Sequence, residues 1–216
     1  MRYNEFKYLW PPRPDAKIPQ SAIKMFERKK YAAQVKKNGT CNIVFANANE
    51  VIFKMRHGPD SDHLQWKPTQ FHEDWFKNEA KKVGGGWCVY VSELLHSKTP
   101  HIKDTIYIFD QIVRNGESLV GTSFGDRQQM LMNDLVHEDS EEARDHYILA
   151  SKGKQGTIVL AKTFLEGYAD IFNNLEAEDE GLVLKRWDAK LEAPITQKSN
   201  NSWQVKCRKP HRNYSF

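Results

Sequence analysis

The stretch YAAQVKKNGTCNIVFANANEVIFKM (31–55) indicates how this chain folds. Residues 31–35 and 41–55 are rich in β-branched and aromatic side chains, and Asn-x-Asn at 47–49 interrupts the second run. Runs of this kind, separated by turn-forming residues, predict a strand, a turn and a strand. Lys36 therefore lies at the end of a predicted strand, immediately before a turn that contains a glycine.

The segment before this stretch is rich in proline. WPPRPDAKIP (10–19) predicts an extended lead-in, because proline fixes φ and has no backbone donor. SAIKMFERK (21–29) predicts a short helix with a serine cap. A chain of 216 residues can hold one sizeable core. We expect residues 1–20 to form the extended lead-in and residues 21–216 to form a single domain.

A helix and a glycine turn are predicted after the opening strands. TQFHEDWFKNEAKKV (69–83) has the spacing of an amphipathic helix, and Gly84-Gly85-Gly86 ends it. The three glycines predict a turn and not a phosphate loop, because no Lys-Ser/Thr pair follows them. The apolar side chains of the helix fall near one face and are interpreted as core residues: Phe71, Trp75, Phe76 and Ala80.

The second half of the chain mixes strands, hairpins and helices. An Asn-Gly pair at 115–116 favours a hairpin turn, and Asp126 is the expected cap of a helix over 124–135. Residues 157–165 fit either a strand or the start of a helix, and residues 165–178 predict mostly helix. The remaining predicted strands are 87–95, 105–113, 181–187 and 202–210. This irregular order predicts an α+β protein with mainly antiparallel sheets flanked by helices.

The composition is that of a soluble protein, with 39% hydrophobic and 28% charged residues. No apolar run approaches the roughly 20 residues of a membrane helix. The N-terminal residues lack the apolar segment of a secretory signal. Three widely spaced cysteines without a C-x-x-C pair predict reduced thiols, not a zinc site. We therefore expect a cytoplasmic protein that does not bind membranes.

Charge is unevenly distributed along the chain. The 32 Lys and Arg residues outnumber the 28 acids and give a net charge of +4. The acids cluster at 138–145 and 176–180, whereas the C-terminal tail is basic. This asymmetry favours a polyanionic partner.

Three short motifs carry candidate chemistry, although each is common by itself. KKNG (36–39) is a lysine before a turn, and EGLVLK (180–185) is an acid and a glycine that open a strand. KCR (206–208) places two cations on one face of a strand. Taken alone, Lys36 would be interpreted as a solvated lysine and Phe109 as a core residue. The order of the motifs along the chain is what distinguishes them from chance matches.

In this order the motifs resemble those of the covalent nucleotidyltransferases, which comprise ATP-dependent DNA ligases, RNA ligases and mRNA capping enzymes. The resemblance spans about residues 31–210. KKNG is similar to the first motif of that superfamily, Lys-x-x-Gly, with Asn38 where aspartate is usual. The other matching segments are KMRHG (54–58), VSELL (91–95), IYIFD (106–110), EGLVLK (180–185) and VKCRKP (205–210).

The resemblance implies a ligase-type adenylation domain in which Lys36 attacks the α-phosphate of ATP. The amine must be deprotonated to attack, and nearby cations lower the pKa of a lysine. Lys36, Glu180 and Lys206 are the catalytic candidates, and Glu180 is the candidate ligand of Mg²⁺ or Mn²⁺. The implied nucleotide contacts, with Glu93 on the ribose and Phe109 stacked on adenine, are Gln34, Val35, Lys36, Gly39, Arg56, Glu93, Phe109, Lys185, Lys206 and Arg208.

The resemblance also implies a nicked duplex as partner, sealed through lysyl-AMP and an adenylylated 5′ end. We expect DNA to be favoured, because residues 92–131 are similar to short bacteriophage DNA ligases, enzymes of replication and repair. RNA ligase is the alternative, since Asn38 also occurs among RNA-ligating members. A catalytically inactive module that binds nucleic acid is a third interpretation. The candidate nucleic-acid contacts are Arg56, Lys77, Lys81, Lys82, Lys209 and Arg212.

The end of the chain is short in comparison with the superfamily. Only eight residues follow Arg208. DNA ligases and capping enzymes place an OB-fold after the motif that contains this arginine. We therefore expect this chain to be a minimal core without a C-terminal OB-fold, acting as a monomer.

Overall fold

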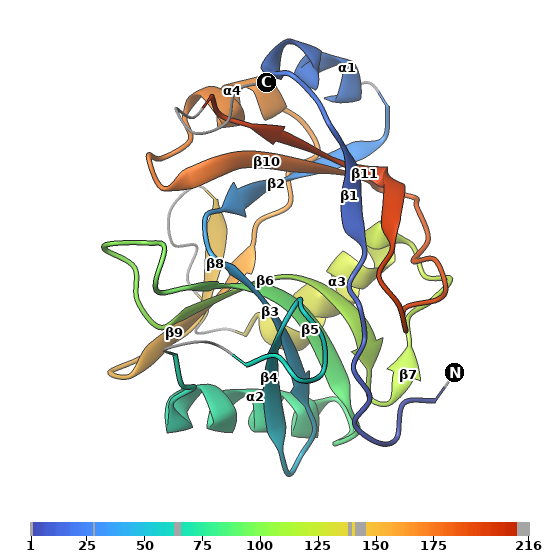
Figure 1. Cartoon of the computed structure of the whole chain (residues 1–216), viewed down its shortest axis with the longest axis vertical. Coiled ribbons are helices and arrows are strands. Elements are labelled where there is room, and N and C mark those ends of the chain that lie inside the picture. Colours follow the sequence, from blue (N-terminus) through green and yellow to red (C-terminus); the bar gives the residue numbers. More distant parts are fainter. Residues whose placement is uncertain (1, 28, 63–65, 138–139, 141–145, 211–216) are drawn as a thin grey trace.

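In the computed structural model, two β-sheets face each other and helices pack against their outer sides (Figure 1). The structure describes the chain except for residues 1, 28, 63–65, 138–139, 141–145 and 211–216. Within this described part, none of the helices has the length and apolar character needed to cross a lipid bilayer. Neighbouring strands are mostly antiparallel, so the predicted α+β class is confirmed.

The larger sheet has seven strands in the order β4-β3-β5-β6-β9-β8, with β7 beside β6. Its neighbours are antiparallel except β6 and β9, which run parallel. Helices α2 (Gln70–Lys82) and α3 (Phe124–Leu135) pack against one face through residues such as Phe76 and Leu131. The strands are β3 (Thr40–Ala46), β4 (Val51–Met55), β5 (Cys88–Leu95), β6 (Thr105–Arg114), β7 (Glu117–Ser118), β8 (Tyr147–Gly153) and β9 (Gly156–Ala161).

The smaller sheet has four strands in the order β1-β11-β10-β2. β1 and β11 are parallel, and the other neighbours are antiparallel. Helices α1 and α4 lie on its outer face, where Ile23, Tyr168 and Phe172 join the apolar side chains of the strands. The elements are β1 (Arg13–Lys17), η1 (Gln20–Ala22), α1 (Ile23–Glu27), β2 (Tyr31–Lys37), α4 (Tyr168–Asn173), β10 (Asp179–Arg186) and β11 (Asn200–Arg208).

Side-chain alternation decides which residues of the smaller sheet face the larger one. Successive side chains of a strand point to opposite faces. In β2, Ala33 and Val35 belong to the outer core, so Gln34 and Lys36 face inward. By the same rule the inward-facing residues of β10 and β11 are Val183, Lys185, Gln204, Lys206 and Arg208.

Most of the predicted helices and strands are confirmed, and the differences have local causes. Asp126 is not the cap of α3: Ser123 is, and its Oγ accepts the backbone N–H of Asp126 at 3.1 Å. A capping oxygen has to come from the residue just outside the helix, which is Ser123. The ambiguous residues 157–165 form strand β9 as far as Ala161. Strands β7 and β8 have no counterpart among the predicted elements.

The helix predicted over 165–178 is shorter than expected, because α4 ends at Asn173. A buried ion pair holds the chain that follows it. Lys37 Nζ lies 2.5 Å from Asp179 Oδ1, and the other oxygen of that carboxylate accepts the backbone N–H of Glu176 at 3.1 Å. This arrangement holds Glu176 and Asp179 in the turn that leads into β10.

The proline-rich lead-in is extended as predicted, and part of it also forms a strand. The backbone N–H of Arg13 donates to Ser199 O at 3.2 Å, and that of Ile18 donates to Lys206 O at 3.0 Å. Further upstream, Tyr3 and Leu9 are buried in the core of the larger sheet. The lead-in therefore contacts both sheets.

Candidate active site

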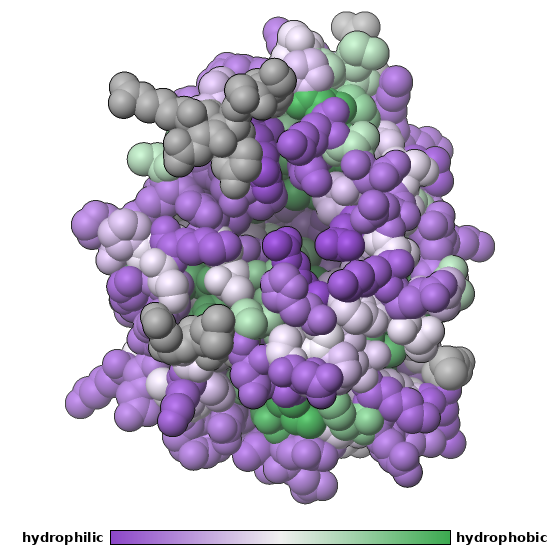
Figure 2. All heavy atoms as spheres, in the orientation of Figure 1, coloured by the Kyte–Doolittle hydropathy of each residue, from purple (hydrophilic) through white to green (hydrophobic). Residues whose placement is uncertain are grey.

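A cavity of about 730 Å³ lies between the two sheets. Figure 2 shows hydrophilic residues gathered around a hollow at this level. Strands of both sheets and residues 10–15 of the lead-in line it. Its described lining contains nine Lys and Arg residues against three acids, so the cavity suits an anionic ligand. The nine are Arg13, Lys36, Lys37, Arg56, Lys98, Lys185, Lys198, Lys206 and Arg208.

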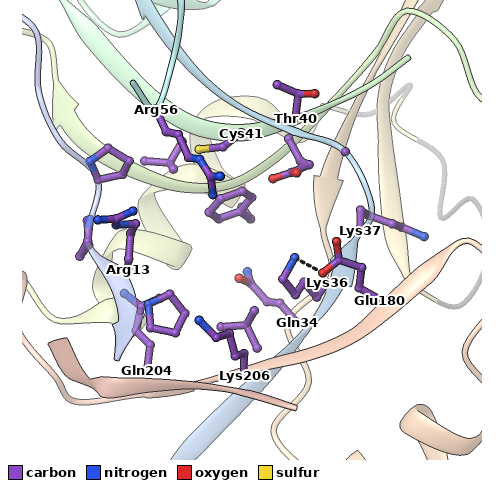
Figure 3. Close-up of a pocket in the computed structure, with 18 of the residues that line it drawn as sticks. Arg13, Gln34, Lys36, Lys37, Thr40, Cys41, Arg56, Glu180, Gln204 and Lys206 are labelled. Atoms are coloured by element: carbon purple, nitrogen blue, oxygen red, sulfur yellow. Dashed lines mark ion pairs between the residues drawn. The ribbon is translucent and has the colours of Figure 1, made fainter. Parts of the chain in front are cut away.

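Lys36 and Glu180 form an ion pair inside the cavity (Figure 3). Lys36 Nζ lies 2.5 Å from Glu180 Oε2, and Arg208 Nε lies 3.2 Å from the same oxygen. The side chains of Lys36 and Glu180 are 20% and 25% exposed, so both stay accessible to a ligand. The carboxylate thus positions the lysine amine in the cavity and is itself held by an arginine.

The neighbouring lysine has a different environment. Lys37 pairs with Asp179 at 2.5 Å, and the two side chains are 6% and 0% exposed. In Figure 3 the side chain of Lys37 points away from the cavity and that of Lys36 points into it. Of the two lysines in KKNG, Lys36 is therefore the one that can act on a ligand.

Gly39 lets the turn after Lys36 pack closely against β5. A Cβ at this position would lie 2.5 Å from Glu93 Cγ and 2.6 Å from Leu94 O, which is too close for any side chain. Lys98 Nζ fixes the turn by donating to Gly39 O at 2.6 Å. The glycine therefore brings the strand end that carries Lys36 next to Glu93.

Glu93 lies in the cavity wall in an unusual electrostatic environment. Burial is the main cause of a raised pKa of about 7, while the charges of Lys36 and Lys98 act in the opposite direction. The carboxyl therefore takes up its proton near neutral pH. A protonated or partly protonated carboxyl can donate as well as accept a hydrogen bond.

We expect Glu93→Gln to stabilise the ligand-free protein at pH 8 but not at pH 4. The folded-state pKa of about 7 exceeds the ordinary value of 4.5, so the folded protein binds the extra proton between these values. Stability contributed by this group is present below pH 4.5 and falls as the pH rises through 7. Glutamine mimics the protonated form, so the variant should melt on the order of 3 °C higher at pH 8.

Melting temperatures measured from pH 4 to pH 8 check this expectation. Glu192→Gln, at an exposed position outside the cavity, is the matched control and should show no such trend. An effect of Glu93→Gln that is equal at all pH values would contradict the role of the buried carboxyl.

Lys185 and Phe109 meet at the inner end of the cavity. Lys185 Nζ lies 4.9 Å from the centre of the Phe109 ring and donates to Gln34 Oε1 at 2.7 Å. Burial is the main cause that lowers the pKa of Lys185 to about 8, with Asp110 opposing it. Gln34 in turn donates to Gln128 Oε1 at 3.0 Å. This network fixes the side chains around the aromatic ring before any ligand binds.

Arg127 supports this region from outside the cavity. Its guanidinium is fully buried and forms two hydrogen bonds with the Asp110 carboxylate, at 2.9 and 3.0 Å. A further nitrogen donates to Thr122 O at 2.9 Å. Arg127 is thus a packing residue that ties α3 to β6, the strand that carries Phe109.

Comparison with known proteins identifies the fold. No protein-family model matches the chain, and no curated protein matches its sequence. A mycobacterial DNA ligase D complexed with ATP and MES matches with a TM-score of 0.58 and 17% identity, over 94% of this chain and 62% of that chain. The ligase domain from M. tuberculosis LigD gives 0.58 and 17%, over 94% and 61%. Pmar-Lig_PreS3 gives 0.60 and 14%, over 92% and 46%. This chain has the fold of a ligase adenylation domain.

The ligase fold brings the predicted nucleotide-binding residues into one place. These residues come from segments far apart in the sequence, and all of them line the cavity between the sheets. This chain spans less than two thirds of the length of each of these three chains. The residues that line the cavity as predicted are Gln34, Val35, Lys36, Gly39, Arg56, Glu93, Phe109, Glu180, Lys185, Lys206 and Arg208.

The predicted nucleic-acid residues do not gather at the cavity, apart from Arg56. Lys77, Lys81 and Lys82 lie on α2, whose buried side chains pack on the face of the larger sheet away from the cavity. Lys209 Nζ donates to Leu175 O at 3.0 Å and so is held at the end of α4. Arg212 lies outside the described residues. Their contact with nucleic acid stays a prediction.

Several cavity residues were not predicted from the sequence. Arg13, Lys98 and Lys198 line the cavity from the lead-in and from loops. Arg13 stands between prolines, which predict a rigid extended segment. They do not predict that this segment lies beside the cavity. Lys98 and Lys198 stand in polar stretches with no signal of their own. Only the folded chain shows that the three contribute to one cavity.

Glu180 was predicted to hold a metal ion. Over the part of the chain that the structure describes, no three His, Cys, Asp or Glu side chains cluster in a way that would hold a metal ion. Glu180 is a carboxylate that faces the cavity. Magnesium is usually held by one or two carboxylates together with water and substrate phosphates. Glu180, one of the three acids that line the cavity, fits that mode of binding.

Proposed function

We propose that this chain is an ATP-dependent polynucleotide ligase that attaches AMP to Lys36 and seals nicks in duplex DNA. The observation that carries the proposal is the Lys36 amine, held by Glu180 inside a cavity lined mainly by cations. The ligase adenylation fold supports it. Because Lys37 is buried in a separate ion pair, the chemistry is assigned to a single lysine.

The attack on ATP requires a neutral amine and a stabilised phosphate. Glu180 holds the Lys36 side chain in the cavity, and the nitrogen bonds to the α-phosphorus as pyrophosphate leaves. Lys206 and Arg208 stand on the same face of β11, where they balance the negative charge of the transition state. Mg²⁺ or Mn²⁺, held by Glu180, would supply further positive charge at the α-phosphate.

The nucleoside is assigned to the inner part of the cavity. The Phe109 ring provides a stacking surface for adenine, and Glu93 is the hydrogen-bonding partner for the ribose. Gln34 and Val35 of β2 also line the cavity, and their backbone can contact the base edge. This placement leaves the α-phosphate beside Lys36.

Phe109→Leu is expected to raise the ATP concentration needed for half-maximal AMP attachment by at least about fivefold, because aromatic stacking on a base is worth about 1–3 kcal/mol. The maximal rate should fall less, since stacking acts on binding. Initial rates measured over a range of ATP concentrations test this. Phe71→Leu, at a half-buried position on α2, is the matched control. An unchanged ATP dependence would mean that Phe109 is a core residue that does not stack on adenine.

The function itself is tested in two steps. Purified protein incubated with ATP and Mg²⁺ should gain the mass of one AMP. The charged protein should then seal nicked DNA at low salt better than nicked RNA, mixed duplexes or single-stranded RNA, because a duplex aligns the 3′-OH and 5′-phosphate. Sealing should weaken steeply as salt rises, since phosphate contacts release counterions.

The outcomes separate the alternatives. A preference for single-stranded RNA ends would favour an RNA ligase, the interpretation to which Asn38 points. Protein that binds nicked duplex but takes up no AMP would be an inactive binding module. Sealing of nicked DNA with the mass gain of AMP supports the proposal as stated.

A further inference from the structure

Three cationic side chains of the cavity are not used by the ion pair of Lys36 and Glu180. Arg13 opens β1, Arg56 follows the last residue of β4, and Lys206 lies in β11 (Figure 3). Among the described residues, these three side chains form no ion pair and no hydrogen bond. Glu180, in contrast, is already paired with Lys36 and Arg208.

The backbone holds Arg13 firmly at this position. Arg13 lies opposite Asn200 in the parallel ladder between β1 and β11, and its N–H donates to Ser199 O at 3.2 Å. Prolines at 11, 12 and 14 restrict φ on both sides of it. Upstream, the N–H of Trp10 donates to Ile195 O at 2.7 Å. A charged residue on so constrained a segment is pre-organised for a ligand.

The charge of Arg13 acts on Lys206, and the charges of Arg13 and Arg56 both act on Cys41, which also lines the cavity. Burial lowers the pKa of Lys206 most, and the charges of Arg208, Lys17, Lys36 and Arg13 lower it further. Arg56, Lys36 and Arg13 all oppose the burial that raises the pKa of Cys41. Glu93 interacts with Arg56, but cations outnumber acids in the cavity lining by nine to three. Like charges repel each other, so an anion bound among them would relieve that repulsion.

The geometry of phosphoryl transfer indicates which anion would bind among these cations. The attacking and leaving groups stand roughly in line on opposite sides of the reacting phosphorus. When the neutral Lys36 amine bonds to the α-phosphorus, the bond to the bridging oxygen of pyrophosphate breaks, its electron pair leaves with pyrophosphate, and the nitrogen releases a proton. In the next step an oxygen of the strand's 5′-phosphate bonds to the same phosphorus. The bond to Lys36 then breaks, and the nitrogen takes up a proton.

Pyrophosphate and the 5′-phosphate therefore occupy the same side of the AMP phosphorus, opposite Lys36. In Figure 3, Arg13 lies across the cavity from the Lys36–Glu180 pair. We propose that Arg13, with Arg56 and Lys206, forms a phosphate site used twice, first by the pyrophosphate part of ATP and then by the 5′-phosphate of the nicked strand. This inference rests on the proposed ligase function.

The test measures the two steps separately with Arg13→Ala. Single-turnover AMP attachment from ATP and AMP transfer from purified protein–AMP to a nicked 5′-phosphate should each slow by at least about tenfold, because Arg13→Ala removes charged hydrogen-bond donors to the phosphate. Arg13→Lys keeps the charge but not the paired donors, so its rates for both steps should lie between those of the wild type and Arg13→Ala. Lys24→Ala removes an exposed charge on α1, outside the cavity, and should change neither step.

Each outcome is decisive. Slowing of both steps by Arg13→Ala, with an unchanged melting temperature and an unaffected Lys24→Ala control, supports the shared site. Slowing of one step only, or of neither, overturns it while the ligase function stands. Wild-type protein that takes up no AMP would overturn the proposed function and this inference with it.

Discussion

Lys36→Ala is expected to abolish AMP attachment, the largest effect of any substitution in this chain. Strand alternation points Lys36 into the cavity, where Glu180 holds its amine at 2.5 Å. Lys37 cannot replace it, because its amine is buried against Asp179 on the other side of the strand. Mass spectrometry after incubation with ATP and Mg²⁺ should show only the unmodified mass.

The same variant also separates the lysine's role from the rest of the site. Lys36→Ala should still seal, slowly, a nick whose 5′ end already carries AMP, because forming the phosphodiester bond does not use the lysine as nucleophile. Lys154→Ala, in the exposed turn between β8 and β9, is the control for loss of a lysine elsewhere. AMP found on folded Lys36→Ala protein would show that the nucleophile is another residue.

Glu180→Ala is expected to slow AMP attachment by at least about a hundredfold, the scale seen when a preorganised charge is removed from a transition state. The carboxylate contacts both Lys36 and Arg208. Its loss therefore removes the contact that positions the Lys36 amine and leaves the arginine side chain less constrained. Lys206→Ala should give a loss of similar size, since it removes a cation from the proposed phosphate site. Single-turnover rates at saturating ATP measure both.

The control for Glu180→Ala is a change just after β10, the strand that carries Glu180. Asp188→Ala breaks the exposed pair with Arg186, whose side chains are 57% and 52% exposed, and should leave the rate unchanged. Melting curves show whether each variant is folded. Wild-type rates from folded Glu180→Ala would mean that the phosphate is bound elsewhere in the cavity.

Local signals in the sequence predicted most of the fold. The spacing of apolar residues predicted α2, and the Asn-Gly pair predicted the turn in which Asn115 and Gly116 adopt positive φ of 49° and 80°. Such features depend on a few neighbouring residues, so they can be read from one segment. β1 could not be predicted in this way, because its partner β11 lies at the other end of the chain.

The candidate site was predicted in part, by resemblance and not by local pattern. The motif residues from Gln34 to Arg208 do share one cavity. The cations assigned to nucleic acid on α2 lie elsewhere, because charge alone does not say which face of a helix or sheet a residue occupies. Arg13 was not predicted, although it lines the same cavity.

The sequence by itself determined the order of the motifs and which side chains of each strand share a face. Alternation puts Gln34 and Lys36 on one face of β2, whatever that strand packs against. Only the tertiary structure decided that this face meets Glu93 and Phe109 across a cavity, and that Lys37 is neutralised by Asp179. The physical reason is that strand pairing and ion pairing join segments distant in sequence, and their energies depend on distances that exist only once both sheets are assembled.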